Sequence, residues 1–208
     1  MDATQELAEV IANAAAVDVG VLPVPTGKIV ICDPFFCASA VPLLESIEPG
    51  SYPVRLHRLM VPGWGRRIGA AELVVRSHGA IAAFRPATSA SEETARYFVE
   101  SGLGSFMDEL IRIEFAETLA QFYRNSPSGN YYGDVLEPEF RALCDNPADP
   151  FDAGDRNMHA YSDDGHARVA MFSSGLGDGT YESYWGLGEH GEVLSLFTNF
   201  LVLSRTRH

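Results

Sequence analysis

Lysine is almost absent from this sequence of 208 residues, and positive charge is scarce in general. Lys28 is the only lysine, and 15 lysine and arginine residues stand against 28 aspartates and glutamates, for a formal net charge of −13. Such an excess of negative charge repels phosphate backbones and anionic lipid headgroups. We therefore expect no nucleic acid and no membrane surface as a partner, whereas a basic protein partner fits the charge.

Cysteine is also scarce, and apolar runs are short. Cys32, Cys37 and Cys144 are an odd number, without the close pairing of structural zinc sites or the even count of disulfide frameworks. No apolar run approaches the roughly 20 residues of a membrane-spanning helix, and residues 1–6 lack the character of a signal peptide. The sequence thus predicts a cytoplasmic protein with reduced thiols, no bound metal and no cofactor. A catalytic cysteine would need a base such as His57 beside it.

What the sequence does contain is ample apolar material for one core. Hydrophobic residues make up 46% of the chain and aromatic residues 11%, which is typical of globular proteins. We divide the chain into an N-terminal helix over residues 1–18 and a single domain over residues 19–208. The helical spacing of apolar residues predicts that the first helix covers residues 2–17.

The remaining pattern consists of strands and one long helix. Two β-rich runs, residues 21–24 and 28–32, flank a Pro/Gly turn and are expected to form a hairpin. Residues 105–123 have an apolar side and an acidic side, which predicts the longest helix. Further strands are expected at residues 54–61, 70–77, 80–84, 166–173, 180–186 and 193–203. The predicted fold class is α+β: an antiparallel β-sheet or sandwich from both chain ends, with the mid-sequence amphipathic helix packed on it.

Several segments together indicate a known family. Asp33-Pro34 follows a predicted strand, residues 49–54 are Pro-Gly-Ser-Tyr-Pro-Val, and residues 99–108 are Val-Glu-Ser-Gly-Leu-Gly-Ser-Phe-Met-Asp. The most specific block is residues 175–186, which begins with Gly-Leu-Gly-Asp-Gly and ends with Tyr-Trp-Gly. Over residues 20–203 the sequence resembles the bacterial family of uncharacterised proteins called domain of unknown function 4241 (DUF4241). The resemblance implies one coherent domain and no particular activity.

The glycine-rich block also holds candidates for a binding site. Residues 175–179 superficially resemble a phosphate-binding loop, but strand composition follows them where such a loop needs a helix, so a tight hairpin turn is the better interpretation. Asp178 either hydrogen-bonds the backbone of that turn or lies beside Asp33 at one end of the sheet. In the second case Asp33, Asp178, Tyr181 and Trp185 form a ligand-binding pocket of two carboxylates and two aromatic rings.

Other polar and aromatic side chains raise the questions of a metal site and of a recognition site. Six aspartates crowd residues 145–164 and raise the question of calcium, but their spacing does not match an EF-hand, so a solvated acidic loop is the default. The histidines lack the spacing of zinc sites. Trp64, in a glycine-containing loop, is either an exposed recognition anchor or a cover for the edge of the core.

None of these candidates brings a credible catalytic motif with it. The leading hypothesis is a non-catalytic binding or interaction protein, in its most specific form an immunity-type partner that neutralises a basic bacterial toxin. The alternative is a small-molecule enzyme or ligand-binding domain with a carboxylate and aromatic pocket at one end of the sheet. A third hypothesis is a structural or accessory domain. A pocket with convergent polar groups would favour the small-molecule enzyme or ligand-binding domain. A flat acidic face would favour the interaction protein.

Overall fold

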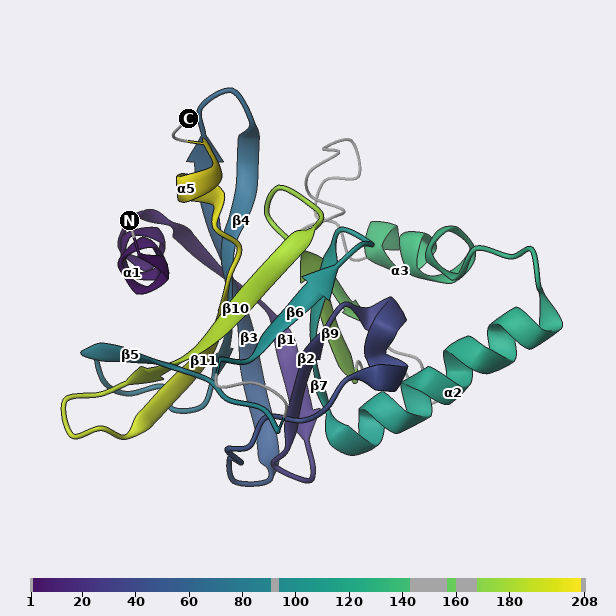
Figure 1. Cartoon of the computed structure of the whole chain (residues 1–208), viewed down its shortest axis with the longest axis horizontal. Helices are drawn as coiled ribbons and strands as arrows, with labels where there is room; N and C mark the ends of the chain where they lie inside the picture. The colour runs from purple at the N-terminus through teal and green to yellow at the C-terminus, as the bar shows by residue number, and fades with distance from the viewer. Residues whose placement is uncertain (1, 91–93, 143–156, 160–167, 207–208) are drawn as a thin grey trace.

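Two antiparallel β-sheets form the frame of the chain (Figure 1). The computed structural model describes residues 2–90, 94–142, 157–159 and 168–206. Sheet A has seven strands in the order β1-β3-β4-β11-β10-β5, with β6 as a further neighbour of β10. The bounds of its strands are β1 Ala15–Val24, β3 Gly50–Val61, β4 Gly65–Val74, β5 Ala83–Pro86, β6 Arg96–Val99, β10 Gly179–Leu187 and β11 Val193–Asn199.

Sheet B is smaller, and one of its strands leads directly into the longest of the described helices. It has four strands in the order β2-β7-β9-β8. Their bounds are β2 Ile29–Cys32, β7 Leu103–Asp108, β8 Asn157–His159 and β9 Val169–Ser173. The helical elements are α1 Ala3–Asn13, a 3-10 helix η1 Pro34–Ser39, α2 Glu109–Asn125, a π-helical turn η2 Tyr132–Leu136, α3 Glu137–Ala142 and α5 Val202–Thr206. Figure 1 shows α1 and α5 on one side of the sheets and α2 and α3 on the other. The predicted α+β class is confirmed.

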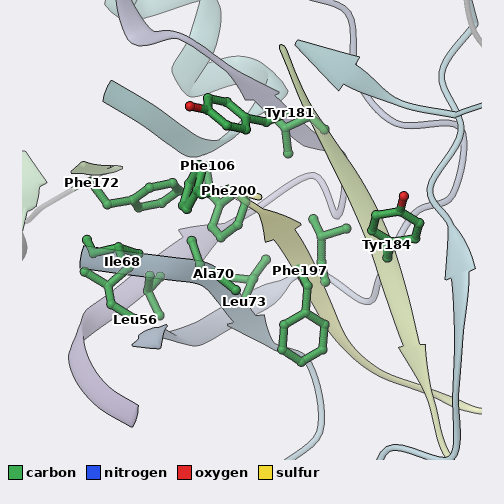
Figure 2. Packing of buried hydrophobic residues seen from close by; sticks show 14 of the residues in the cluster. Leu56, Ile68, Ala70, Leu73, Phe106, Phe172, Tyr181, Tyr184, Phe197 and Phe200 are labelled. Carbon is green, nitrogen blue, oxygen red and sulfur yellow. The ribbon is translucent and has the colours of Figure 1, made fainter. Parts of the chain in front are cut away.

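Strands β2, β7 and β9 of sheet B are buried on both faces, because their alternate side chains enter two different hydrophobic clusters. Phe106 belongs to the cluster that joins the two sheets, where its ring meets Phe172 with centroids 4.9 Å apart (Figure 2). Met107, the next residue, belongs to the cluster on the other face, with Ile111 and Phe115 of α2. Each such buried side chain stabilises the fold by about 1.5–3 kcal/mol. This alternation positions η1 and α2 against sheet B.

The predicted hairpin over residues 21–32 is wrong. β1 pairs with β3, whereas β2 pairs with β7, so these two neighbouring strands enter different sheets. The turn between them is held by Thr26, whose backbone N–H and hydroxyl both donate to Oδ2 of Asp108, at 2.9 and 2.7 Å. Oδ1 of the same carboxylate accepts from the N–H of Leu110 at 2.9 Å and caps α2. One buried aspartate therefore fixes both the crossover and the helix start.

Two predicted helix boundaries are also corrected. The first helix ends at Asn13 rather than at residue 17, because the chain from Ala15 onward pairs with β3. The helix predicted for residues 105–123 begins at Glu109, because the preceding residues form β7, which pairs with both β2 and β9. In both places the pairing of an entire strand outweighs the local helical pattern.

The two ends of the described chain are held together. The predicted closing strand, residues 193–203, ends at Asn199, and α5 follows it. The side-chain amide of Asn199 donates to the carbonyl of Ala3 at 2.9 Å, and the buried carboxylate of Glu6 accepts from the N–H of Leu203, also at 2.9 Å. These bonds connect α1 with β11 and α5 and keep α1 against sheet A.

Candidate functional site

Asp33 is held by three backbone N–H groups. It follows β2 directly and caps η1, where its Oδ1 accepts from the N–H of Phe35 at 2.9 Å. Its Oδ2 accepts from the N–H groups of Glu100 and Ser101 at 3.0 and 2.9 Å. The side chain is buried, so these bonds satisfy its oxygens inside the protein. The carboxylate thus connects the start of η1 with the turn between β6 and β7.

Asp178 and Tyr181 lie at the turn between β9 and β10. The tight hairpin predicted for residues 175–179 is wrong, because β9 pairs within sheet B and β10 within sheet A, so this turn connects the two sheets. Asp178 is exposed, and its carboxylate makes no hydrogen bond with the described residues. The turn is held instead by the Tyr181 hydroxyl, which lies 3.0 Å from the carbonyl oxygen of Ser174 and accepts from the Arg205 guanidinium at 3.1 Å. Burial raises the pKa of Tyr181 above its ordinary value. Tyr181 is therefore a core residue that stabilises the turn.

Trp185 lies further along β10 and lines a pocket of about 300 Å³, which we call the Trp185 pocket. Asp33 lines a different pocket, between β2 and β6. Tyr181 is in the core and Asp178 is exposed, so the four residues selected from the sequence do not line one pocket together. Their role in ligand binding stays a prediction.

The pocket that Asp33 lines, named here the β2–β6 pocket, has a volume of about 330 Å³. Among the described strands, β2 pairs with β7 alone and β6 with β10 alone, so each has one edge that joins no sheet. Three large apolar side chains line the pocket and are still exposed: Phe36 by 49%, Val41 by 44% and Phe98 by 57%. Tyr97, also in the lining, is nearly buried. The pocket therefore has an exposed apolar rim, and apolar and polar side chains mix in its buried lining.

Two free thiols lie at or near this pocket. Cys32 lines it, and Cys37 lies in η1. Burial raises the pKa of Cys37 to about 11 and also raises the pKa of Cys32, so both thiols are protonated at neutral pH and are poor nucleophiles. Cys32 contacts the Ser105 hydroxyl at 3.6 Å, whereas His57 contacts Glu72 on the other sheet.

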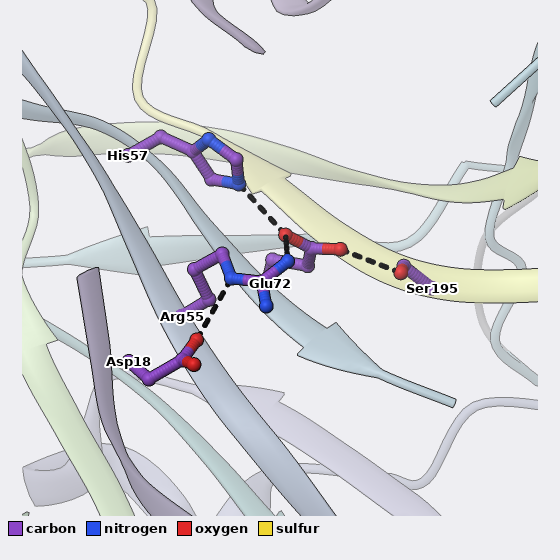
Figure 3. Close-up of polar contacts among 5 residues, drawn as sticks. All are labelled: Asp18, Arg55, His57, Glu72 and Ser195. Carbon is purple, nitrogen blue, oxygen red and sulfur yellow. Dashed lines mark hydrogen bonds and ion pairs between the residues drawn. The ribbon is translucent and has the colours of Figure 1, made fainter. Parts of the chain in front are cut away.

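A group of polar side chains on sheet A, the Glu72 cluster, spans four adjacent strands (Figure 3). Glu72 of β4 lies at its centre and accepts from His57 Nε2 at 2.8 Å and from Ser195 Oγ at 2.6 Å. The guanidinium of Arg55 lies 3.6 Å from the Glu72 carboxylate, and its Nε donates to Asp18 at 2.8 Å. His57, Glu72 and Ser195 are all buried. The cluster is thus a chain of charges and hydrogen bonds across the sheet.

The order of groups in this cluster determines its chemistry. Burial tends to raise the pKa of Glu72, but the hydrogen bonds from His57 and Ser195 and the charge of Arg55 outweigh it and hold the pKa below its ordinary value. An activated serine needs the histidine in contact with its hydroxyl, whereas here the glutamate lies between the two. The arrangement therefore stabilises an ionised buried carboxylate and does not activate Ser195.

The sequence suggests His57 only as a possible base beside a catalytic cysteine and does not indicate this cluster. Its members are far apart in the chain, and the register alone brings them together: Arg55 pairs with both Asp18 and Glu72. In the sequence, Glu72 stands inside the apolar run of β4, where an unpaired charge would be costly. A buried glutamate in such a strand indicates a partner on a neighbouring strand.

Some sequence-based interpretations concern residues outside the described ranges. Cys144, His166 and the aspartates at residues 145–164 belong to this group.

Within the described ranges, no group of three or more His, Cys, Asp or Glu side chains is suited to hold a metal ion. In that same part of the chain, every helix is too short or too polar to cross a membrane. Trp64 lies at the β3–β4 turn, is 50% exposed, and is not among the side chains that pack against either hydrophobic cluster.

The described residues form a two-sheet α+β protein whose cavities include the β2–β6 pocket and the Trp185 pocket. Comparison with protein families gives a match over residues 22–198 to the family described as protein of unknown function (DUF4241). The chain therefore belongs to this family, and the resemblance seen in the sequence is confirmed. No curated protein and no solved structure matches the chain.

Proposed function

We propose that the chain is a non-catalytic binding protein that recognises a basic protein partner at the β2–β6 pocket. The observation that carries this proposal is the exposed apolar rim of the pocket, formed by Phe36, Val41 and Phe98. Exposed aromatic side chains beside a hollow are typical of interaction sites, where they become the buried anchors of a complex. The rim residues come from η1, the segment after it and β6, so a partner would bridge the edges of both sheets.

The charge of the chain supports the basic character of the partner. A net charge of −13 attracts basic proteins over long distances and increases their association rate. In its most specific form, the proposal is that the partner is a basic toxin that this chain neutralises, as an immunity-type protein does. A toxin is one example of a basic partner. Any other basic partner would contact the same exposed apolar rim.

The groups with possible chemical roles near the pocket support binding rather than catalysis. The oxygens of Asp33 accept three backbone N–H groups, and the thiols of Cys32 and Cys37 are protonated at neutral pH. Each of these groups has a packing or hydrogen-bonding role that accounts for its position.

A paired set of variants tests the proposal. The double variant Phe36→Ser/Phe98→Ser removes two rim side chains that are largely exposed, so the fold should persist. Met60→Ser is the matched control, because Met60 is 77% exposed on β3 and does not line the pocket. Proteins captured from the source cell by the wild-type chain are identified by mass spectrometry, and the affinity of each purified partner is then measured for all three chains.

The expected result is a basic partner that binds the wild-type chain and the Met60→Ser variant equally. Loss of the two rim aromatics should weaken binding at least about 30-fold, because truncation of a single hot spot already costs about 2 kcal/mol and the effects of two are not additive. Higher salt should slow association of the same partner. Capture of no basic protein, or equal binding by the double variant, would overturn the proposal.

A further inference from the structure

The β2–β6 pocket interrupts a line of backbone pairing along the free edge of β2. Among the described strands, β2 and β6 lie side by side at the pocket without pairing with each other (Figure 1). Leu43 covers the first part of this edge: its N–H donates to the carbonyl of Ile29 at 2.8 Å, and on its other side Leu43 bridges to Ser89. Beyond Ile29 the edge faces the pocket, which Ile31 lines. The chain itself therefore pairs with this edge at Ile29 and leaves it open at Ile31.

The alternation of backbone groups shows which residues of β2 face this edge. In an antiparallel pair, alternate residues direct their N–H and C=O groups toward the partner strand, and the residues between them direct theirs away. The carbonyl of Lys28 accepts from the N–H of Glu109 at 3.0 Å, at the start of the β2–β7 ladder. Counted from Lys28 in steps of two, the even-numbered residues face β7, whereas Ile29 and Ile31 face the opposite edge. The backbone groups of Ile31 are therefore directed toward the pocket.

Both of these backbone groups lack a protein partner. Within the described ranges, neither the N–H nor the carbonyl of Ile31 makes a hydrogen bond. The residue is only 6% exposed, and backbone groups in such a sheltered place are normally paired. A strand edge with unpaired N–H and C=O groups is a template for a further strand. An extended segment in the pocket would supply an acceptor and a donor for Ile31.

The surroundings of Ile31 suit an extended and basic segment. Successive side chains of such a segment point to opposite faces, and the exposed rings of Phe36 and Phe98 offer apolar contacts to them. Asp33 and Arg96 are the charged side chains of the lining and have opposite signs. Glu100, whose N–H donates to Asp33, is exposed at the same end and makes no ion pair with the described residues. A basic side chain of the segment would meet this carboxylate.

We propose that the partner enters the β2–β6 pocket as an extended segment that pairs with Ile31 and adds a strand to the edge of sheet B. The N–H of Ile31 donates to a carbonyl of the segment, and its carbonyl accepts from an N–H of the segment. Apolar side chains of the segment contact Phe36 and Phe98. This inference rests on the proposed function and adds the conformation in which the partner binds. Main-chain bonds then contribute affinity, and the rim contributes specificity.

The capped peptide Ac-Lys-Val-Lys-Val-Lys-Val-Lys-NH2 is the probe, because its valines favour an extended chain and its lysines are complementary to the net charge of −13. The control peptide Ac-Glu-Val-Glu-Val-Glu-Val-Glu-NH2 keeps the valines and reverses the charge. Binding to the isotope-labelled chain at low salt is followed by nuclear magnetic resonance. Isotope-filtered Overhauser spectra detect contacts between the Ile31 amide proton and backbone protons of the peptide. The amides of β1, at the far end of sheet A, are the internal control.

We expect the basic peptide to bind the wild-type chain and the Met60→Ser variant equally, at millimolar concentrations or below. The Ile31 amide should show Overhauser contacts to the peptide backbone, and its exchange with solvent should slow at least about tenfold, whereas the amides of β1 should not change. The acidic peptide should bind at least about tenfold more weakly to the wild-type chain, and so should the basic peptide to Phe36→Ser/Phe98→Ser.

The outcomes separate this inference from the proposed function. A peptide that binds and is weakened by the rim variant, but makes no contact with the Ile31 amide, would overturn the strand pairing and leave the proposed function in place. Absence of peptide binding at millimolar concentrations would also overturn the pairing, while the capture of a basic protein tests the proposed function by itself. If the peptide pairs with Ile31 and no basic protein is captured, the pairing is supported and the proposed function alone fails.

Discussion

Replacement of Asp33 by asparagine tests whether this carboxylate holds η1 against the β6–β7 turn. The change preserves the size of the side chain and replaces one acceptor oxygen with an NH2 group. If the amide oxygen faces Glu100 and Ser101, the NH2 group meets the N–H of Phe35. In the opposite orientation, two N–H groups lose their acceptor. At least one buried donor therefore becomes unpaired.

The expected loss of stability follows from these three hydrogen bonds. A bond to a charged group contributes about 1.5–3 kcal/mol, and a change from a charged to a neutral acceptor weakens each remaining bond by about 1 kcal/mol. The Asp33→Asn variant should therefore lose about 3–5 kcal/mol of unfolding free energy. In a chain of this size, each kcal/mol lowers the melting temperature by about 2–4 °C. The melting temperature should then fall by at least about 6 °C.

Urea unfolding, followed by tryptophan fluorescence and by circular dichroism, measures this loss. Asp178→Asn is the matched control, because its exposed carboxylate makes no hydrogen bond with the described residues. It should change the unfolding free energy by less than about 0.5 kcal/mol. If Asp33→Asn costs less than about 1 kcal/mol, or no more than the control, then the three hydrogen bonds do not stabilise this loop as argued.

Three further predictions concern buried groups. Because the folded pKa of Glu72 lies below its ordinary value of 4.5, its contribution to stability is lost as the pH falls through the folded pKa, and Glu72→Gln should flatten acid unfolding below about pH 5. Gly104→Ala places a Cβ 2.5 Å from the Tyr97 hydroxyl, and urea unfolding should show a loss of about 1–3 kcal/mol. In a Cys144→Ser chain, Cys37, with its pKa of about 11, and the other buried thiol should react with iodoacetamide only after unfolding.

The sequence predicts most of the elements of this fold but not their pairing. The alternating pattern of residues 54–61 and the amphipathic pattern after residue 109 are both confirmed, because they depend on local periodicity. The partner of a strand depends on contacts far along the chain, and for this reason β1 and β2 were wrongly predicted to pair with each other. Nothing between residues 21 and 32 indicates that Asp108 will hold the intervening turn.

The same limit applies to the candidate site. Trp185 was selected from the sequence, and it does line a pocket, but that pocket's carboxylates come from Glu45 and Glu48. Asp33 was selected for its position after a strand, and that position places it against backbone N–H groups. Sequence position can show that a carboxylate lies near the end of a sheet. Whether backbone donors occupy its oxygens depends on the turn that packs against it.

The hydrogen bonds of the buried carboxylates also limit what the net charge of −13 can do. Glu6, Asp33, Glu72 and Asp108 are all buried, and each accepts hydrogen bonds from the protein itself. A basic partner therefore meets only the exposed carboxylates, and contacts with these are screened by salt. The apolar rim of the β2–β6 pocket is not screened. Salt should accordingly slow the association of a partner, whereas loss of the rim aromatics should accelerate its dissociation, and surface plasmon resonance at two ionic strengths separates these effects. If salt changed only dissociation, exposed charge would not be guiding the encounter.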